Sequence, residues 1–203
     1  MALGILILST TLNSTISISA IEVNGVGVYW DINGNNEVTE IDWGTLNPGS
    51  VKNIEVYVRV EREEPTYLIL STTNWNPPNA FDYITLRCNY AGQQIDPGEA
   101  LQITLTLSIS RHIKGISSFS FDMLFTGSDH LLGDVNGNGV VGPMDFGDVA
   151  MMCSIYSGLI KGPPELLERG DINRNGVVGP TDFGDLLKIF LIYSGNTLAV
   201  PSV

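Results

Sequence analysis

The residues best suited to chemistry in this chain are Asp and Asn side chains that recur at alternate positions near the carboxyl terminus. Residues 133–158 align with residues 170–195 at an offset of 37, and 17 of the 26 aligned positions are identical. Each copy contains Asp-x-Asn-x-Asn-Gly-Val-Val-Gly-Pro-x-Asp. Loop positions 1, 3, 5, 7 and 12 are Asp134, Asn136, Asn138, Val140 and Asp145 in the first copy, and Asp171, Asn173, Asn175, Val177 and Asp182 in the second.

This spacing is typical of a loop that binds calcium, which takes about six to eight hard oxygen ligands. Position 6 is Gly for the sharp turn, position 7 offers a backbone carbonyl, and position 12 offers a carboxylate. Position 9 is Gly142 or Gly179, so we expect water or no ligand there. Each loop brings only two carboxylates. The sequence therefore predicts two calcium ions, bound with dissociation constants on the order of 10⁻⁴–10⁻³ M as in extracellular modules.

Apolar stripes follow each loop and predict a short helix after it, packed against its twin. They comprise Phe146, Val149, Met152, Cys153 and Tyr156, then Phe183, Leu186, Leu187, Phe190 and Ile192. By this reading Cys153 lies buried on the apolar face of the first helix, and Cys88 lies on the apolar face of a strand. Both are expected to be free thiols, with a disulfide between them left open as the less favoured alternative.

The duplicated loop and helix, with Asp rather than Glu at position 12, resemble dockerin modules over residues 133–195. The resemblance implies that the ten loop residues named above are calcium ligands, and that the partner is a cohesin domain. The positions at which dockerins commonly contact cohesins are mostly apolar here, a composition that suits packing on a neighbouring domain. They are Pro143, Met144, Ala150, Met151, Pro180, Thr181, Leu187 and Lys188.

Residues 22–130 are typical of antiparallel strands with one buried face, because apolar and polar residues alternate with period two. The alternating runs are Ile54–Val60, Ile84–Tyr90, Leu101–Ile109 and Phe119–Met123, and Pro-rich and Gly-rich turns separate them. About seven short strands without an intervening helical pattern predict an Ig-like sandwich. Residues 28–30 and 41–46, with the Pro-Gly turns, also resemble prokaryotic cell-surface Ig-like modules. The expected fold class is mainly β: an Ig-like antiparallel β-sandwich at 22–130, then a small α-helical dockerin-like domain at 131–203.

Residues 1–21 form a leader without a charged side chain, and three interpretations remain open for it. Ala2–Leu8 is an apolar run that fits a secretory signal, with small residues near a cleavage point at Ser17–Ala20. The Ile, Ser and Thr residues that follow favour an extended strand, which could complete the sandwich of the next subunit. A membrane anchor is the third interpretation, although the apolar run is far shorter than the ~20 residues that span a bilayer.

Two further groups of residues could carry a binding function. Asp31, Asn33, Asn35 and Asp42 stand at loop positions 1, 3, 5 and 12, but Asn36 replaces the required Gly. A hairpin turn and a third calcium site are therefore both open at residues 31–42. Trp30, Trp43 and Trp75 would suit either the sandwich core or a sugar-stacking surface.

The composition excludes several classes of protein. Ten basic and 22 acidic residues give a net charge of −12, so we predict no nucleic-acid partner. The chain holds two His residues and no recognisable catalytic motif, which predicts a protein that is not an enzyme. The sequence thus predicts a secreted, calcium-binding structural protein of the cell surface, forming a head-to-tail homopolymer by exchange of the N-terminal strand. A cohesin-binding adaptor and a carbohydrate-binding module are the alternatives, and a membrane contact is expected only if the leader is an anchor.

Overall fold

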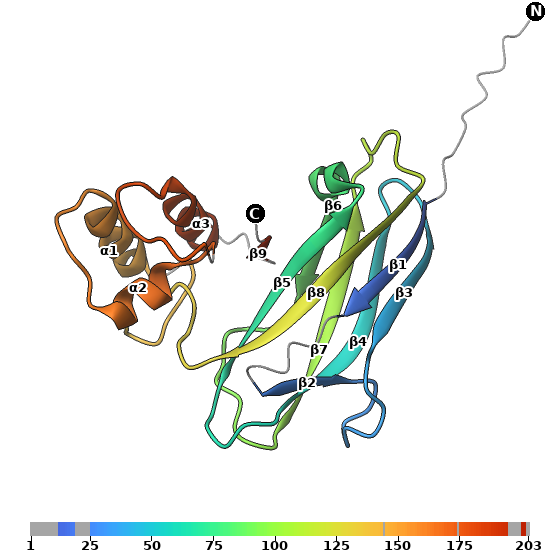
Figure 1. Ribbon diagram of the computed structural model, residues 1–203, viewed down its shortest axis with the longest axis horizontal. Helices are drawn as coiled ribbons and strands as arrows, with labels where there is room; N and C mark the ends of the chain where they lie inside the picture. The colour runs from blue at the N-terminus through green and yellow to red at the C-terminus, as the bar shows by residue number, and fades with distance from the viewer. Residues whose placement is uncertain (1–11, 19–24, 144, 174, 195–199, 202–203) are drawn as a thin grey trace, which may run out of the picture.

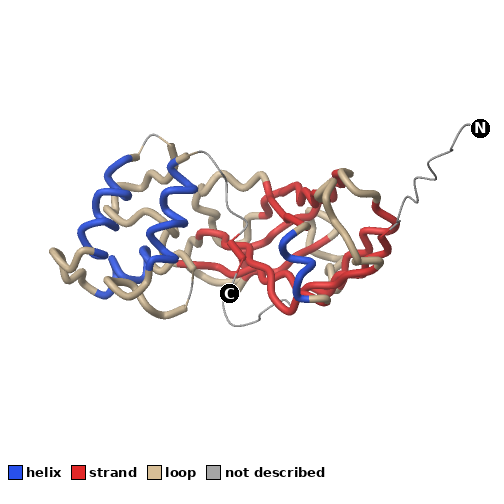
Figure 2. The backbone as a smooth tube through the Cα atoms, turned by 90° about the horizontal axis from the view of Figure 1, so that it is seen from above, coloured by secondary structure: helices blue, strands red, loops and turns tan. Residues whose placement is uncertain are grey.

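The computed structural model describes residues 12–18, 25–143, 145–173, 175–194 and 200–201. The chain is mainly β, with two sheets in which antiparallel pairs predominate, and its described residues include three short α-helices. The strands lie at one end of the molecule together with a short 3₁₀-helix, Pro78–Asp82, and the three α-helices lie at the other end (Figures 1 and 2). None of the helices in these ranges is long and apolar enough to cross a membrane.

The first sheet has the strand order β3-β1-β8-β5-β9, and the second has β2-β4-β7-β6. The pairs β1–β8 and β5–β9 are parallel, and all the other pairs are antiparallel. The strands are β1 (Leu12–Ile18), β2 (Val26–Tyr29), β3 (Glu40–Leu46), β4 (Val51–Val60), β5 (Tyr67–Asn76), β6 (Ile84–Cys88), β7 (Ala100–Ile109), β8 (Ser118–Ser128) and β9 (Val200–Pro201).

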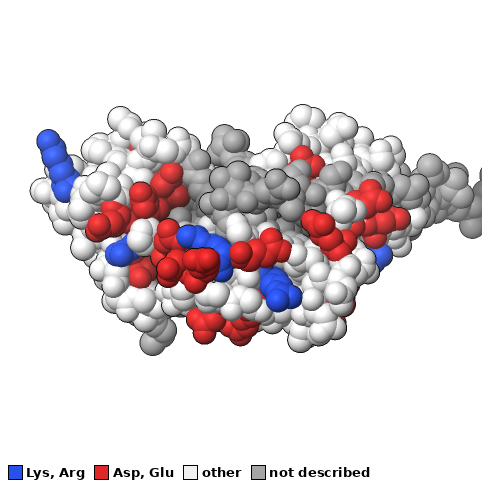
Figure 3. Space-filling model, turned by 60° about the horizontal axis from the view of Figure 1, so that its bottom comes forward, with Lys and Arg blue, Asp and Glu red and all other residues white. Residues whose placement is uncertain are grey.

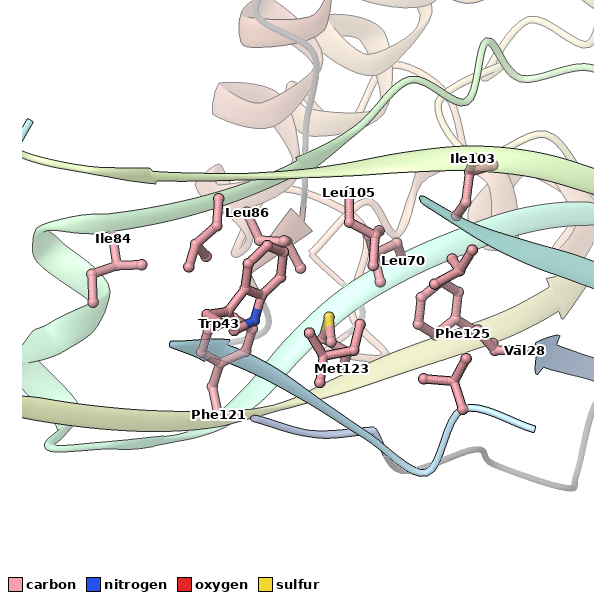
Figure 4. Packing of buried hydrophobic residues seen from close by; sticks show 14 of the residues in the cluster. Val28, Trp43, Leu70, Ile84, Leu86, Ile103, Leu105, Phe121, Met123 and Phe125 are labelled. Atoms are coloured by element: carbon pink, nitrogen blue, oxygen red, sulfur yellow. The ribbon is translucent and has the colours of Figure 1, made fainter. Parts of the chain in front are cut away.

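The two sheets enclose a single apolar core, which explains the alternation in the sequence. Trp43, Phe121 and Met123 from the first sheet point toward Leu86 and Leu105 of the second (Figure 4). These five side chains are at most 2% exposed. The alternation in β4, β7 and β8 is therefore confirmed as the mark of strands with one buried face.

The expected leader contributes a strand to this fold. Its residues Leu12–Ile18 form β1 between β3 and β8, so this part of the leader is extended. The apolar run Ala2–Leu8, like the rest of 1–11 and like 19–21, lies outside the described residues. The structure thus bears on the extended-strand interpretation for residues 12–18 only.

The helical part contains α1 (Phe146–Tyr156) and α3 (Phe183–Tyr193), one after each predicted loop, as expected. A third helix that the sequence analysis missed, α2 (Pro164–Gly170), lies between the two repeats. The helices α1 and α3 contact each other around a small core made of Val135, Val149, Met152, Ile155, Ile172, Leu186 and Ile189. The Phe that opens each helix packs edge-on against the Tyr that closes the other, with ring centroids 5.8 Å apart in both pairs.

Cys153 lies on the exposed side of α1, so the prediction that it is buried is wrong. The buried residues of α1 include Val149, Met152 and Ile155, and Cys153 falls outside that stripe. Cys88 is half-buried against the sandwich core, and both thiols are free. The structure therefore contains no disulfide between them.

The helical module contacts the strands across a cavity of about 300 Å³. Tyr67, Leu70 and Tyr90 line it on one side, and Pro143, Ile172 and Ile192 line it on the other. Among the positions expected to pack on a neighbouring domain, Pro143 lines this cavity but is itself exposed, as are Ala150 and Leu187, and Met144 lies outside the described residues. An ion pair between His130 and Glu168, 3.3 Å long, joins the segment after β8 to α2.

Candidate metal centre

Both predicted loops end by capping a helix. Asp145 is the N-cap of α1, and its side chain accepts a hydrogen bond of 2.7 Å from Gly147 N. Asp182 caps α3 in the same way, through a bond of 2.7 Å from Gly184 N. An Asp at the N-cap satisfies a helical N–H that has no partner within the helix. The last residue of each loop is therefore fixed in place by the helix that follows.

The first loop is folded around its own polar side chains. Asp134 accepts hydrogen bonds of 2.9 Å from Asn138 N and Gly139 N, one on each carboxylate oxygen. The amide oxygen of Asn136 accepts from Asn138 N at 2.9 Å, and that of Asn138 accepts from Val140 N at 2.8 Å. Gly139 has a φ of +81°, a conformation that few other residues adopt, and it makes the sharp turn at position 6.

The second loop repeats this network almost bond for bond. Asp171 accepts from Asn175 N at 3.0 Å and from Gly176 N at 2.9 Å. Asn173 accepts from Asn175 N at 3.0 Å, and Asn175 accepts from Val177 N at 2.8 Å. Because the network recurs with different residues around it, the repeated sequence itself specifies the loop conformation.

The side chains at positions 3, 5 and 12 meet inside each loop. In the first loop, Asn136 Nδ2 lies 3.2 Å from both carboxylate oxygens of Asp145, and Asn138 Nδ2 lies 2.6 Å from Asp145 Oδ2. In the second loop, Asn173 and Asn175 contact Asp182 at 2.7–3.1 Å. The structure thus brings together the predicted side chains at these positions, while position 1 organises the backbone beneath them.

The donor set fits a hard divalent cation. Each loop gathers two carboxylates and two amides, and an amide group can turn to present its oxygen to an ion. The side chains of Val140 and Val177 contain no ligand atom, so a contribution from position 7 would come from the main-chain carbonyl. Gly142 and Gly179 have no side chain at position 9, and an added Cβ would meet nothing within 4 Å. Residues that fit calcium are therefore present at positions 1, 3, 5, 7 and 12 of both loops.

The carboxyl groups at position 12 have lowered pKa values, which favour the charged form that binds a cation. Burial acts to raise the pKa of Asp145, but hydrogen bonds from Asn138, Asn136 and two backbone N–H groups outweigh it, and the pKa is lowered. The same balance lowers the pKa of Asp182, with Asn173 and Asn175 as the side-chain donors. Both groups therefore carry a negative charge at neutral pH, as a calcium ligand requires.

Two functional residues escaped the sequence analysis, Asp148 and Asp185, each three residues beyond position 12. They are 1% and 0% exposed, and each Oδ1 accepts the backbone N–H of position 3, at 3.0 Å from Asn136 and 2.8 Å from Asn173. Their Oδ2 atoms are buried without a hydrogen-bond partner. The repeated Asp-Phe-Gly-Asp of the two copies was the available signal, because it keeps Asp at this point in both.

Burial, reinforced by the loop carboxylates nearby, raises the pKa of Asp148 to about 6 and that of Asp185 to about 7. The backbone N–H groups of positions 2 and 3 act in the opposite direction. Position 2 is an apolar residue fully buried in the small core, Val135 in one loop and Ile172 in the other. The beginning of each loop is therefore held twice, by an apolar side chain and by a carboxylate from the helix.

No group of three or more His, Cys, Asp or Glu side chains in a metal-binding arrangement is found in the described part of the chain. This finding concerns those four residue types, whereas half of the predicted side-chain ligands are Asn. The assignment of the ten loop residues as calcium ligands stays a prediction.

The possible third loop has a different arrangement. Asp31 accepts hydrogen bonds from Asn33 N and Asn35 N, at 2.9 Å and 3.4 Å, within a turn that follows β2. Asp42 lies on β3 and accepts from Gly44 N of the same strand at 2.7 Å. The hydrogen bonds of each carboxylate stay within its own segment, which favours the turn interpretation for residues 31–42.

The tryptophans are distributed unevenly between core and surface. Trp43 is fully buried, and Trp75 stacks on Phe121 with ring centroids 4.0 Å apart. Trp30 is 39% exposed. Two of the three side chains that could have stacked on a sugar therefore pack in or against the core.

The surface charge agrees with the composition. On the face drawn in Figure 3, Asp and Glu side chains form several patches, while Lys and Arg are few. Such a surface repels a phosphate backbone, and the absence of a nucleic-acid partner stays a prediction.

No family model matches this chain, and no curated protein matches it. We therefore infer the function from the geometry of the two loops and from the arrangement of the strands.

Proposed function

We propose that this protein is a non-enzymatic, calcium-binding structural protein of the cell exterior, the subunit of a surface filament or layer. In this proposal the strands form an Ig-like sandwich and residues 131–203 form a dockerin-like module that binds two calcium ions. The N-terminal strand joins subunits head to tail. The observation that carries the proposal is the twin hydrogen-bond network of the loops, which gathers ionised Asp and amide groups at the same positions twice.

The expected affinity favours the cell exterior. Two carboxylates for each ion, and Gly at position 9, predict dissociation constants on the order of 10⁻⁴–10⁻³ M, in the range of extracellular modules. Loops of this strength would remain largely empty at the low calcium levels inside cells. Calcium would then add stability only after secretion, when the module takes its place in the assembly.

Calorimetric titration of calcium into the chelator-treated full chain tests this function. We expect two ions per chain and a raised melting temperature. Asp134→Ala and Asp171→Ala should each remove one ion, because each variant disrupts one loop and leaves the other. Asp42→Ala is the matched control, since we expect it to leave the stoichiometry at two. Absence of both heat and thermal stabilisation in millimolar calcium would contradict the proposal.

A dockerin-type adaptor that binds a cohesin domain is the second candidate, and the outer face of α3 favours it. Phe183, Leu187, Phe190 and Leu191 are 37–58% exposed there, and they form an apolar stripe. Capture by a panel of immobilised cohesin domains, with and without chelator, separates the two functions. Calcium-dependent capture of the wild type, lost in Leu187→Asp, supports the adaptor; polymers that form without any second protein support the filament subunit.

A further inference from the structure

The N-terminal strand β1 occupies an interior position of its sheet. It pairs antiparallel with β3, from Leu12 opposite Leu46 to Ser17 opposite Glu40, and parallel with β8, from Asn13 opposite Ser118 to Ile18 opposite Met123. Terminal strands commonly add to the outer edge of a sheet, where they can be lost without disturbing the rest. Here the first strand of the chain fills a gap between two later strands.

The strand β3 depends on β1 for its place in the sheet. Within the described ranges, the strand order gives β3 no neighbour other than β1. Yet β3 carries Ile41, Trp43 and Leu46, which are 1%, 0% and 5% exposed in the core. Removal of β1 would leave the backbone of β3 and one edge of β8 unpaired, beside exposed core. We call this gap between β3 and β8 the β1 slot.

The connectivity allows β1 to leave its own slot without threading the chain. The strand is joined to the fold only through residues 19–25, which lead to β2 in the opposite sheet. Seven residues can span about 25 Å when extended, compared with about 10 Å between packed sheets. Both strands of the slot, β3 and β8, come later in the sequence, so a strand from another chain can pair with them as β1 does.

We propose that the β1 slot receives the β1 strand of a second copy of this chain. The registers with β3 and β8 are the same whether the strand comes from its own chain or from a neighbour, so the exchange conserves these hydrogen bonds. The strand has no charged residue, and it therefore adds nothing to the repulsion between subunits of net charge −12. Strand and slot are different surfaces, so repeated exchange generates an open chain of subunits.

This inference deepens the proposed function and rests on it, because it names the two strands, β3 and β8, that receive the N-terminal strand of the neighbouring subunit. It also implies that the mature chain retains residues 12–18. Cleavage of a signal near Ala20 would remove the strand that fills the slot.

A disulfide between Ser17→Cys and Glu40→Cys tests the exchange in the full chain, in a background of Cys88→Ala and Cys153→Ser. The two positions are opposed in the β1–β3 register. Cα atoms of antiparallel partners lie about 4.5–5.5 Å apart, within the range that a disulfide bridges. After assembly at high concentration, oxidation and denaturing electrophoresis without reductant, we expect a ladder of covalently linked chains. A product that runs as a single chain at every concentration would overturn the proposal.

The matched control places the disulfide between strands that are not exchanged. Arg87→Cys and Thr106→Cys are opposed in the β6–β7 register, and this variant should yield only a single-chain product. A ladder from this control as well would attribute the ladder to random oxidation and overturn the inference. Calcium titration of the same Ser17→Cys/Glu40→Cys chain separates the hypothesis of calcium binding from that of strand exchange. If the chain binds two ions but gives only a single-chain product, calcium binding is supported and strand exchange is contradicted.

Discussion

The sandwich and the helical module differ in how they are held together. The sandwich encloses a continuous apolar core to which all the strands from β2 to β8 contribute. Among the described residues of the helical module, seven buried apolar side chains form the core between α1, α3 and the two loops. Small cores of this kind usually need a metal or another cross-link for stability. We therefore expect the polar loops to supply in the helical module the stability that apolar burial supplies in the sandwich.

The largest effect in the sandwich is expected from Trp43→Ala, because Trp43 is fully buried between the sheets. Truncation of a buried aromatic side chain costs about 3–5 kcal/mol of the free energy of unfolding. We expect the strand transition in calorimetry to shift down and the helical transition to stay. Trp43→Phe is the control: it keeps a ring and removes an indole N–H that has no partner, so it should cost less. Equal shifts of both transitions would show that the two regions unfold as one unit.

Calcium removal should produce the complementary result. When the free calcium concentration is about 100 times the dissociation constant, each bound ion adds roughly 2.7 kcal/mol to the free energy of unfolding of the part that binds it. Chelation is therefore expected to lower the helical transition and to leave the strand transition unchanged. Circular dichroism at the helical band, compared with tryptophan fluorescence, follows the two parts separately, because Trp30, Trp43 and Trp75 all lie in the strand region. An equal response of both signals to chelator would contradict the expectation that calcium stabilises the helical module alone.

The loop-anchoring carboxylates give the next largest effect. Asp148→Ala and Asp185→Ala each leave the backbone N–H of loop position 3, on Asn136 or Asn173, without its acceptor. An unsatisfied buried donor costs about 1–3 kcal/mol. We expect this loss in chelator-treated protein, measured by denaturant unfolding, and little loss with Asn in place of Ala, because Asn keeps an acceptor oxygen. A destabilised Asn variant would assign the effect to the charge instead of the hydrogen bonds.

The link between the regions should contribute least. Glu168→Gln removes the charge that faces His130, in an ion pair whose Glu side chain is 66% exposed. Exposed pairs contribute about 0–1 kcal/mol. We expect the free energy of unfolding of each region to change by no more than that amount, and the difference between the two melting temperatures to stay as in the wild type. A larger shift would mean that the ion pair couples the two regions.

The sequence revealed those elements in which one face is buried and the other is wet. The strands β4, β7 and β8 alternate with period two for this reason. In the helices only part of each predicted stripe is buried: Met152 and Leu186 are, but Leu187 is 51% exposed. The strand β5 was missed because Leu68, Ile69, Leu70, Ser71 and Thr72 are all buried, which removes the alternation. Ile69 faces away from the sandwich core and lines the cavity beside Leu131. Burial by a distant part of the chain cannot be read from a local pattern.

At the candidate site, too, the sequence predicted only the features that depend on a local pattern. The spacing of Asp and Asn located both loops, because the ligand pattern is local in sequence. The role of Asp148 and Asp185 depends on how a helix folds back onto the start of its loop, which the spacing alone does not reveal. The leader likewise left three interpretations open, since the position of β1 depends on strands 22 and 100 residues further along the chain.

The pairing of β9 with β5 has a mechanical consequence. The chain leaves the first sheet at the end of β8 and returns to it at Ser71 and Thr72 of β5, so the helical module is tethered to neighbouring strands at both of its ends. A pulling force applied at the carboxyl terminus would reach the backbone pairs of β9 before it reached the two predicted metal-binding loops. The backbone pairs between β9 and β5 would therefore bear the load first, and the helical module would be under tension only after they separate.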